Sequence, residues 1–224
     1  MYSNIKPFLF YLFFNVIIYY SYSIVDIIFH KYSLSYNNIN PTHKKIYFTS
    51  NIVKGVTLGL FSISAFNIFI QYFIYNYWNT NYIRYLGGMY ASLDIVSIIK
   101  VPKMQMNTFI HHLIVQLLYY YSLFIVDFNE NTLAKGIVIY AIFSTFCYIV
   151  NVYLALRLII NEKYNIQLSK ISNYIYKTCC LLNWCYQLYF LYIVDSYIIT
   201  KLIYITILGL VVFDDIVLIQ FLQH

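Results

Sequence analysis

Long apolar stretches separated by short polar breaks constrain this chain more than any other feature of its sequence. They lie near residues 7–29, 47–75, 82–99, 106–126, 132–160, 172–194 and 200–222. About 20 apolar residues in a helix cross the roughly 30 Å hydrocarbon core of a membrane. Of the 224 residues, 62% are hydrophobic and only 10% are charged, so no soluble domain is left over. The sequence therefore predicts an all-α membrane protein with about seven transmembrane helices.

Composition excludes one broad class of function and explains two other features. The net charge is +6, but the cations stand singly in short loops and form no basic face, so nucleic-acid binding is not expected. The 28 tyrosines are interpreted as mostly lipid-facing or interfacial. The cysteines lack C-x-x-C spacing and are interpreted as small buried apolar side chains. They are Cys147, Cys179, Cys180 and Cys185.

The lysines predict how the chain is oriented in the membrane. The first, third and fifth connections carry most of the cations, whereas the N-terminus and the even connections carry fewer. Because loops rich in Lys and Arg stay in the cytosol, we expect the odd connections there. This places the N-terminus on the lumenal side and the C-terminus in the cytosol.

Ionisable side chains inside the spans are the candidates for function, because a charge in hydrocarbon costs several kcal/mol unless it is paired or faces a watery cavity. They are Lys54, Asp94, His111, His112, Asp214 and Asp215. At about 1.5 Å per residue, four of the helices place such a group about 9 to 13 Å inside their cytosolic ends. We therefore expect a polar chamber that opens toward the cytosol. Arg157 and Asp26 lie nearer their helix ends and are interpreted as structural.

The third and fourth spans each have a polar face. In the third, Tyr90 and Asp94 are one turn apart, and Gly87 and Gly88 before them permit close helix approach. In the fourth, at about 100° per residue, the polar side chains fall within one half of the circumference. These are Asn107, Thr108, His111, His112, Gln116, Tyr119 and Ser122. Both histidines can therefore face inward, and an Asp94–histidine contact would raise the basicity of the imidazole.

These observations predict a site, with a structural buried pair as the alternative. The residues assigned to catalysis are His111, His112 and Asp94. The residues assigned to substrate binding are Tyr90, Asn107, Gln116, Lys54 and Asp214. A metal is not expected, because adjacent side chains on a helix diverge and no third histidine lies in the membrane.

A family resemblance rests on the third and fourth spans. The segment YLGGMYASLDIVSIIKVPKMQMNTFIHHLIVQLLYYYSL, Tyr85 to Leu123, resembles the centre of the TLC domain, where a G-x-x-Y-x-x-x-D helix precedes a helix with two adjacent histidines. HKKIYFTSNIVKG from His43 and NVYLALRLI from Asn151 resemble flanking family segments more weakly. The resemblance implies a barrel-like bundle of six helices around a central cavity, usually in the endoplasmic reticulum or related membranes. Residues 1–42 would then be an additional N-terminal helix and loop, and residues 43–224 the TLC-like domain.

The resemblance also implies two branches of function. In ceramide synthases the paired histidines and acids on the following helix transfer an acyl group from acyl-CoA to a sphingoid base, so that His111 or His112 would be nucleophile or base. Residues 132–160 contain no Asp or Glu, so this acid pair is missing. The chain is therefore nearer the branch implicated in membrane-lipid composition, fluidity or trafficking.

The leading hypothesis is a multi-pass membrane protein that binds a lipid or fatty-acyl chain and influences membrane lipid metabolism or composition. It requires no cofactor, and a homodimer is compatible with it. One alternative is a ceramide-synthase-like lipid N-acyltransferase with acyl-CoA as co-substrate. A second alternative is a seven-helix receptor or channel.

Overall fold

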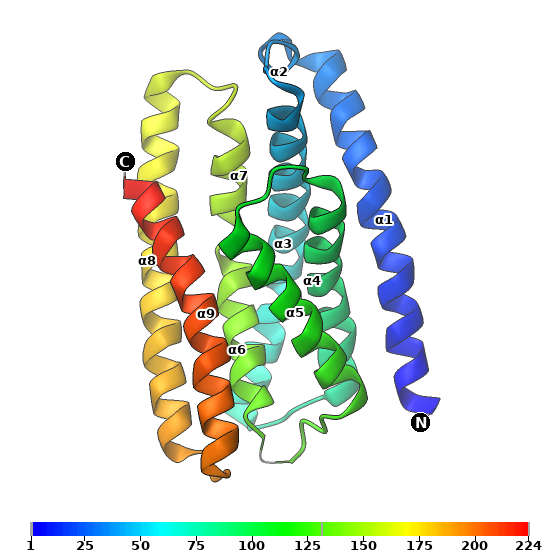
Figure 1. Ribbon diagram of the computed structural model, residues 1–224, viewed down its shortest axis with the longest axis vertical. Helices are drawn as coiled ribbons and strands as arrows, with labels where there is room; N and C mark the ends of the chain where they lie inside the picture. The colour runs from blue at the N-terminus through cyan, green and yellow to red at the C-terminus, as the bar shows by residue number, and fades with distance from the viewer. Residues whose placement is uncertain (1, 131, 224) are drawn as a thin grey trace.

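The computed structural model describes residues 2–130 and 132–223, and every regular element in these ranges is a helix. The helices are α1 (Tyr2–Tyr32), α2 (Leu34–Asn37), α3 (Thr42–Tyr75), α4 (Thr80–Lys100), α5 (Met106–Phe124), α6 (Ala134–Phe146), α7 (Tyr148–Leu156), α8 (Glu162–Ile193) and α9 (Ile198–Gln223). The long helices run up and down one axis as a bundle, with α5 tilted across the face seen in Figure 1. The two chain ends lie toward opposite ends of this bundle (Figure 1).

Several helices have the length and composition of membrane spans. Three qualify by themselves, namely Asn4–Tyr32, Thr42–Tyr75 and Ile198–Gln223, and the bent pair α6 and α7 is a fourth if it is one span. The remaining long helices, α4, α5 and α8, carry buried polar side chains, which lower their hydropathy. The prediction of an all-helical chain is confirmed, and the apolar helices are compatible with membrane insertion. The count of seven spans stays a prediction.

The predicted span at residues 132–160 is broken at Cys147. Helices α6 and α7 meet there at an angle of 41°. Just before the break, Thr145 Oγ1 donates to the Ala141 carbonyl at 2.8 Å, and Cys147 Sγ donates to the Phe143 carbonyl at 3.3 Å. Such side-chain bonds to the preceding turn bend helices, and an apolar pattern alone does not reveal them. The bend follows Ser144, whose side chain lines the cavities described below.

Gly55 and Gly88 are among the glycines that set close helix contacts around the interior. A Cβ atom at Gly55 would lie 2.7 Å from Val152 Cγ2 and 3.1 Å from the Val152 amide nitrogen, so α3 and α7 approach only because none is present. At Gly88, on α4, a Cβ atom would lie 2.8 Å from the Tyr119 hydroxyl. Gly87 has only ordinary contacts, at 3.5 Å or more, so the close approach expected at Gly87 and Gly88 occurs at Gly88.

Buried Arg84, near the N-terminal end of α4, joins this helix to α1 and to the C-terminal end of α5. Its Nη2 donates to the Val126 carbonyl at 2.8 Å, its Nε to the Ser122 carbonyl at 3.2 Å, and its Nη1 to Asn4 Oδ1 at 2.8 Å. The last carbonyls of a helix have no partner within the helix itself. Arg84 supplies donors to this end of α5 and links it to α1 and α4.

Candidate functional site

Three ionisable side chains from three helices form a compact triangle inside the bundle. Lys54 Nζ lies 3.2 Å from Asp94 Oδ1 and 3.2 Å from His112 Nε2. His112 Nδ1 lies 2.9 Å from Asp94 Oδ1, which is ion-pairing distance but outside hydrogen-bond geometry. Since α3, α4 and α5 each contribute one member, the contact depends on how these helices pack.

A second pair lies beside this triangle. His111 Nδ1 is 3.4 Å from Asp214 Oδ2, which α9 contributes. Asp214 Oδ1 accepts hydrogen bonds from Asn107 Nδ2 at 2.7 Å and from Thr108 Oγ1 at 3.3 Å. The first turn of α5 therefore fixes the carboxylate that faces its own histidine.

The two histidines have unequal surroundings. Their rings are nearly perpendicular, with centroids 5.6 Å apart at 89°. His112 is 5% exposed and has a charged neighbour at each ring nitrogen. His111 Nδ1 lies 3.4 Å from Asp214 Oδ2 but outside hydrogen-bond geometry, and neither ring nitrogen of His111 has a hydrogen-bond partner among the described residues. His111 is therefore the imidazole with a nitrogen left for a ligand.

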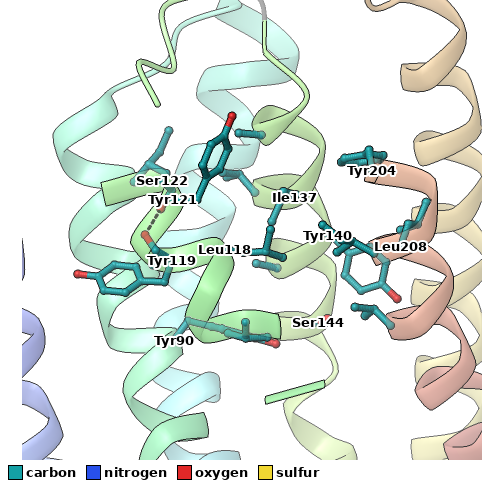
Figure 2. A pocket seen from close by; sticks show the side chains of 18 of the residues that line it. Tyr90, Leu118, Tyr119, Tyr121, Ser122, Ile137, Tyr140, Ser144, Tyr204 and Leu208 are labelled. Atoms are coloured by element: carbon teal, nitrogen blue, oxygen red, sulfur yellow. Dashed lines mark hydrogen bonds between the residues drawn. The ribbon is translucent and has the colours of Figure 1, made fainter. Parts of the chain in front are cut away.

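Two cavities meet at His111. The polar cavity, about 450 Å³ in volume, contains the Lys54–Asp94–His112 triangle and reaches Lys103 in the α4–α5 connection. The apolar cavity, about 120 Å³, extends the other way, toward Phe128 and Ala134. Figure 2 shows side chains around it from α4, α5, α6 and α9, including Tyr90, Leu118, Ile137 and Leu208. The residues common to both cavities are Tyr90, His111 and Ser144.

The structure brings most of the residues assigned to the site together, but it places Gln116 elsewhere. Tyr90, Asn107, Lys54 and Asp214 all line the polar cavity, together with the three residues assigned to catalysis. Gln116 lines none of the cavities described here. Its Oε1 accepts from the Tyr11 hydroxyl at 2.8 Å, and its Nε2 donates to the Ala91 carbonyl at 2.6 Å. The polar half of α5 is thus wide enough to face both the cavity and α1.

Asp215 forms a buried cluster that the sequence did not reveal. Its carboxylate accepts from Tyr176 at 2.7 Å, from Trp184 Nε1 at 3.4 Å and from Tyr140. These donors come from α6 and α8, so Asp215 joins those helices to α9. In the sequence, Asp215 is visible as a second acid in an apolar helix. The sequence did not show which tyrosines bind it, because most tyrosines were interpreted as contacting lipid.

A metal would compete with a cation that the protein already supplies. Asp94, His111 and His112 each offer one ligand atom, all within 4.8 Å of one another. Lys54 Nζ, however, lies 3.2 Å from ligand atoms of both Asp94 and His112. Its positive charge would repel a divalent ion at short range, so the arrangement fits the ammonium better than a metal.

Comparison with protein-family models, with curated proteins and with solved structures finds no match to this chain.

Proposed function

We propose that this chain is a TLC-type membrane protein that binds a lipid or fatty-acyl chain in its two joined cavities and influences membrane lipid composition, in the endoplasmic reticulum or a related membrane. The observation that carries the proposal is the junction at His111, where a polar cavity continues into an apolar one. Binding sites for amphipathic molecules combine a mostly apolar wall with a few convergent polar groups. A lipid likewise has a polar head group at one end and an apolar chain along the rest of its length.

Unpartnered polar atoms support this proposal. Asp94 Oδ2 is buried and has no hydrogen-bond partner among the described residues, and the same holds for His111 Nδ1, which faces Asp214 only at 3.4 Å. Buried polar atoms are nearly always satisfied, so those facing a cavity call for a ligand or water. The head group of the lipid would lie in the polar cavity beside Asp94 and His111, and its hydrocarbon chain would lie among Val115, Leu118 and Leu208.

One observation favours lipid N-acyl transfer as a second candidate. The acids expected on the helix after the histidines are missing, but α9 places Asp214 3.4 Å from His111 Nδ1. A carboxylate there would hold the Nδ1 proton and leave Nε2 nucleophilic. His111 Nε2 would attack the thioester carbonyl of acyl-CoA, forming an N–C bond while the C–S bond breaks and CoA leaves as thiolate. An amine would then take the acyl group, lose its proton and release the imidazole.

One experiment separates binding from catalysis. The protein is purified, co-purified lipids are identified by mass spectrometry, and acyl-CoA is then added with candidate amines. His111→Ala is compared with His112→Ala and with His30→Ala, an exposed histidine outside the cavities. An acyl adduct on His111, absent from His111→Ala, would establish catalysis.

Bound lipid without turnover would support binding alone, provided that His111→Ala lowers its amount relative to His30→Ala. Equal amounts of lipid in all three variants, without any adduct, would refute the proposed site.

A further inference from the structure

A wide hollow continues from the polar cavity to the end of the bundle. Its volume is about 1110 Å³, and it shares Tyr47, Arg157 and Phe221 with the polar cavity. The ends of several helices surround it, with Lys44 on the first turn of α3 and Asn165 on the first turn of α8. Any ligand that enters the polar cavity from this end passes Arg157.

Arg157 is held in place without a balancing charge. Its guanidinium carbon lies 4.5 Å from the ring centroid of Phe221 and 6.0 Å from that of Tyr47. Its Nε donates to the Leu154 carbonyl at 3.4 Å, and the Tyr47 side chain interacts with the guanidinium. No carboxylate lies within ion-pairing distance of it in residues 2–130 and 132–223. The guanidinium therefore lines the hollow with its charge unbalanced by any carboxylate among the described residues, and Leu154 and Tyr47 occupy only part of its five donors.

Two lysines add to this positive charge. Lys44 lines the hollow and Lys103 lines the polar cavity next to it, and neither has an ion-pair partner among the described residues. Deeper in the polar cavity, by contrast, Lys54 is paired with Asp94. The preference for cations in cytosolic loops accounts for lysines in this region. It does not account for an arginine clamped between aromatic rings at the junction of two cavities.

We propose that this entrance binds the phosphate group of an acyl-bearing ligand, with Arg157 and Lys44 on the phosphate and the acyl chain directed toward His111. The proposal rests on the proposed lipid-binding function and specifies its ligand class. A planar guanidinium matches phosphate oxygens in two parallel hydrogen bonds, and a phosphate monoester carries about −1.5 to −2 charges for several cations to share. A cationic amine would be repelled here, and a carboxylate would leave part of this charge unbalanced. Phosphatidic and lysophosphatidic acids carry a phosphate monoester, and acyl-CoA carries one on its ribose.

The test uses ligands with the same acyl chain and different head groups. Palmitoyl-CoA, palmitoyl lysophosphatidic acid, monopalmitoylglycerol and palmitate are titrated against the purified full chain in neutral detergent, with binding followed by native mass spectrometry. Arg157→Gln and Lys44→Gln are the test variants, Arg157→Lys is the conservative variant, and Lys163→Gln is a control for net charge at an exposed position outside the hollow.

We expect at least one phosphate ligand to bind more tightly than monopalmitoylglycerol and palmitate. Arg157→Gln should weaken that ligand about tenfold and leave monopalmitoylglycerol unchanged, because one charge-assisted contact is lost. Arg157→Lys should retain part of the preference, and Lys163→Gln all of it. Preference for lysophosphatidic acid would identify the ligand as a phospholipid. Preference for palmitoyl-CoA would identify it as an acyl-CoA thioester.

Equal binding of all four ligands, unaltered in Arg157→Gln, would overturn this inference and leave the proposed lipid-binding function intact. Binding of palmitate as tightly as the phosphate ligands would also overturn it. Failure of every ligand to bind would overturn both proposals.

Discussion

Two cationic sites inside this bundle, at buried Arg84 and at half-buried Lys54, show how similar charges can have different roles. Arg84 donates three hydrogen bonds to oxygens of α1 and of the end of α5, and it lines no cavity described here. Lys54 shares its charge with Asp94 and His112 at the wall of a cavity of about 450 Å³. The difference teaches that burial alone does not identify a functional charge. Unused hydrogen-bonding capacity next to open space is the more informative property.

The largest expected effect comes from breaking the Lys54–Asp94 pair. Asp94→Leu leaves Lys54 and His112 without their carboxylate and should lower the free energy of unfolding by about 3–5 kcal/mol, whereas Lys54→Met should cost less because His112 still lies 2.9 Å from Asp94. The double variant should lose much less than the sum, because both charges are gone. Unfolding in detergent, followed by tryptophan fluorescence, measures all three. Additive losses would contradict direct pairing, and a stable double variant that keeps its lipid would make the polar cavity structural, like the Arg84 site.

Replacement of Arg84 should lower the free energy of unfolding nearly as much, without affecting lipid binding by the folded protein. Arg84→Met removes three charge-assisted hydrogen bonds and leaves the Val126 carbonyl buried without a donor, so we expect a loss of about 3 kcal/mol. The folded fraction should still carry lipid. The same unfolding assay, together with lipid mass spectrometry, tests this. A stable Arg84→Met variant that had lost its lipid would reverse the roles assigned to the two sites.

A smaller effect is expected where α3 and α7 touch. Gly55→Ala places a Cβ atom against Val152 and should cost about 1–3 kcal/mol by overpacking. Because Gly55 follows Lys54, we also expect weaker lipid binding in this variant. Gly209→Ala is the matched control, since nothing lies within 4 Å of its added atom, and it should be neutral or stabilising. Equal behaviour of the two variants in thermal unfolding would argue against a close α3–α7 contact.

The smallest effect concerns Asp127, in the loop near the Arg84 site. The Asn129 amide and the Thr80 hydroxyl both donate to its carboxylate, and they lower the pKa of Asp127 from its ordinary value of 3.8. A carboxyl group whose pKa is lower in the folded state stabilises the fold fully above 3.8, and this contribution disappears as pH falls through the folded pKa.

The thermal midpoint should therefore fall on acidification below pH 4 by more in the unmodified chain than in Asp127→Asn. Thermal unfolding measured between pH 2 and pH 7 tests this difference. Identical pH profiles would show that the loop bonds contribute nothing to stability.

Depth counting along single helices predicted much of the polar site. Residues such as Asp94 and His111 are recognisable because an ionisable group in an apolar helix needs a partner or water, and their distance from the helix end follows from the helical rise. The same argument gave no role to Arg157, since a long side chain near a helix end can reach water unaided. Its clamp of aromatic rings comes from α3 and α9, far away in sequence.

The sequence by itself determined that this chain consists of strongly apolar helices and that their few ionisable side chains face the interior. Both follow from single segments, because helix periodicity and the cost of a charge in hydrocarbon can be evaluated one helix at a time. Tertiary structure decided which groups meet. It paired His112 with Asp94 and His111 with Asp214, turned Gln116 toward α1 and bent the α6–α7 segment at Cys147. These outcomes depend on how helices rotate against one another, and that rotation is set by contacts such as Gly55 on Val152, which join residues distant in the chain.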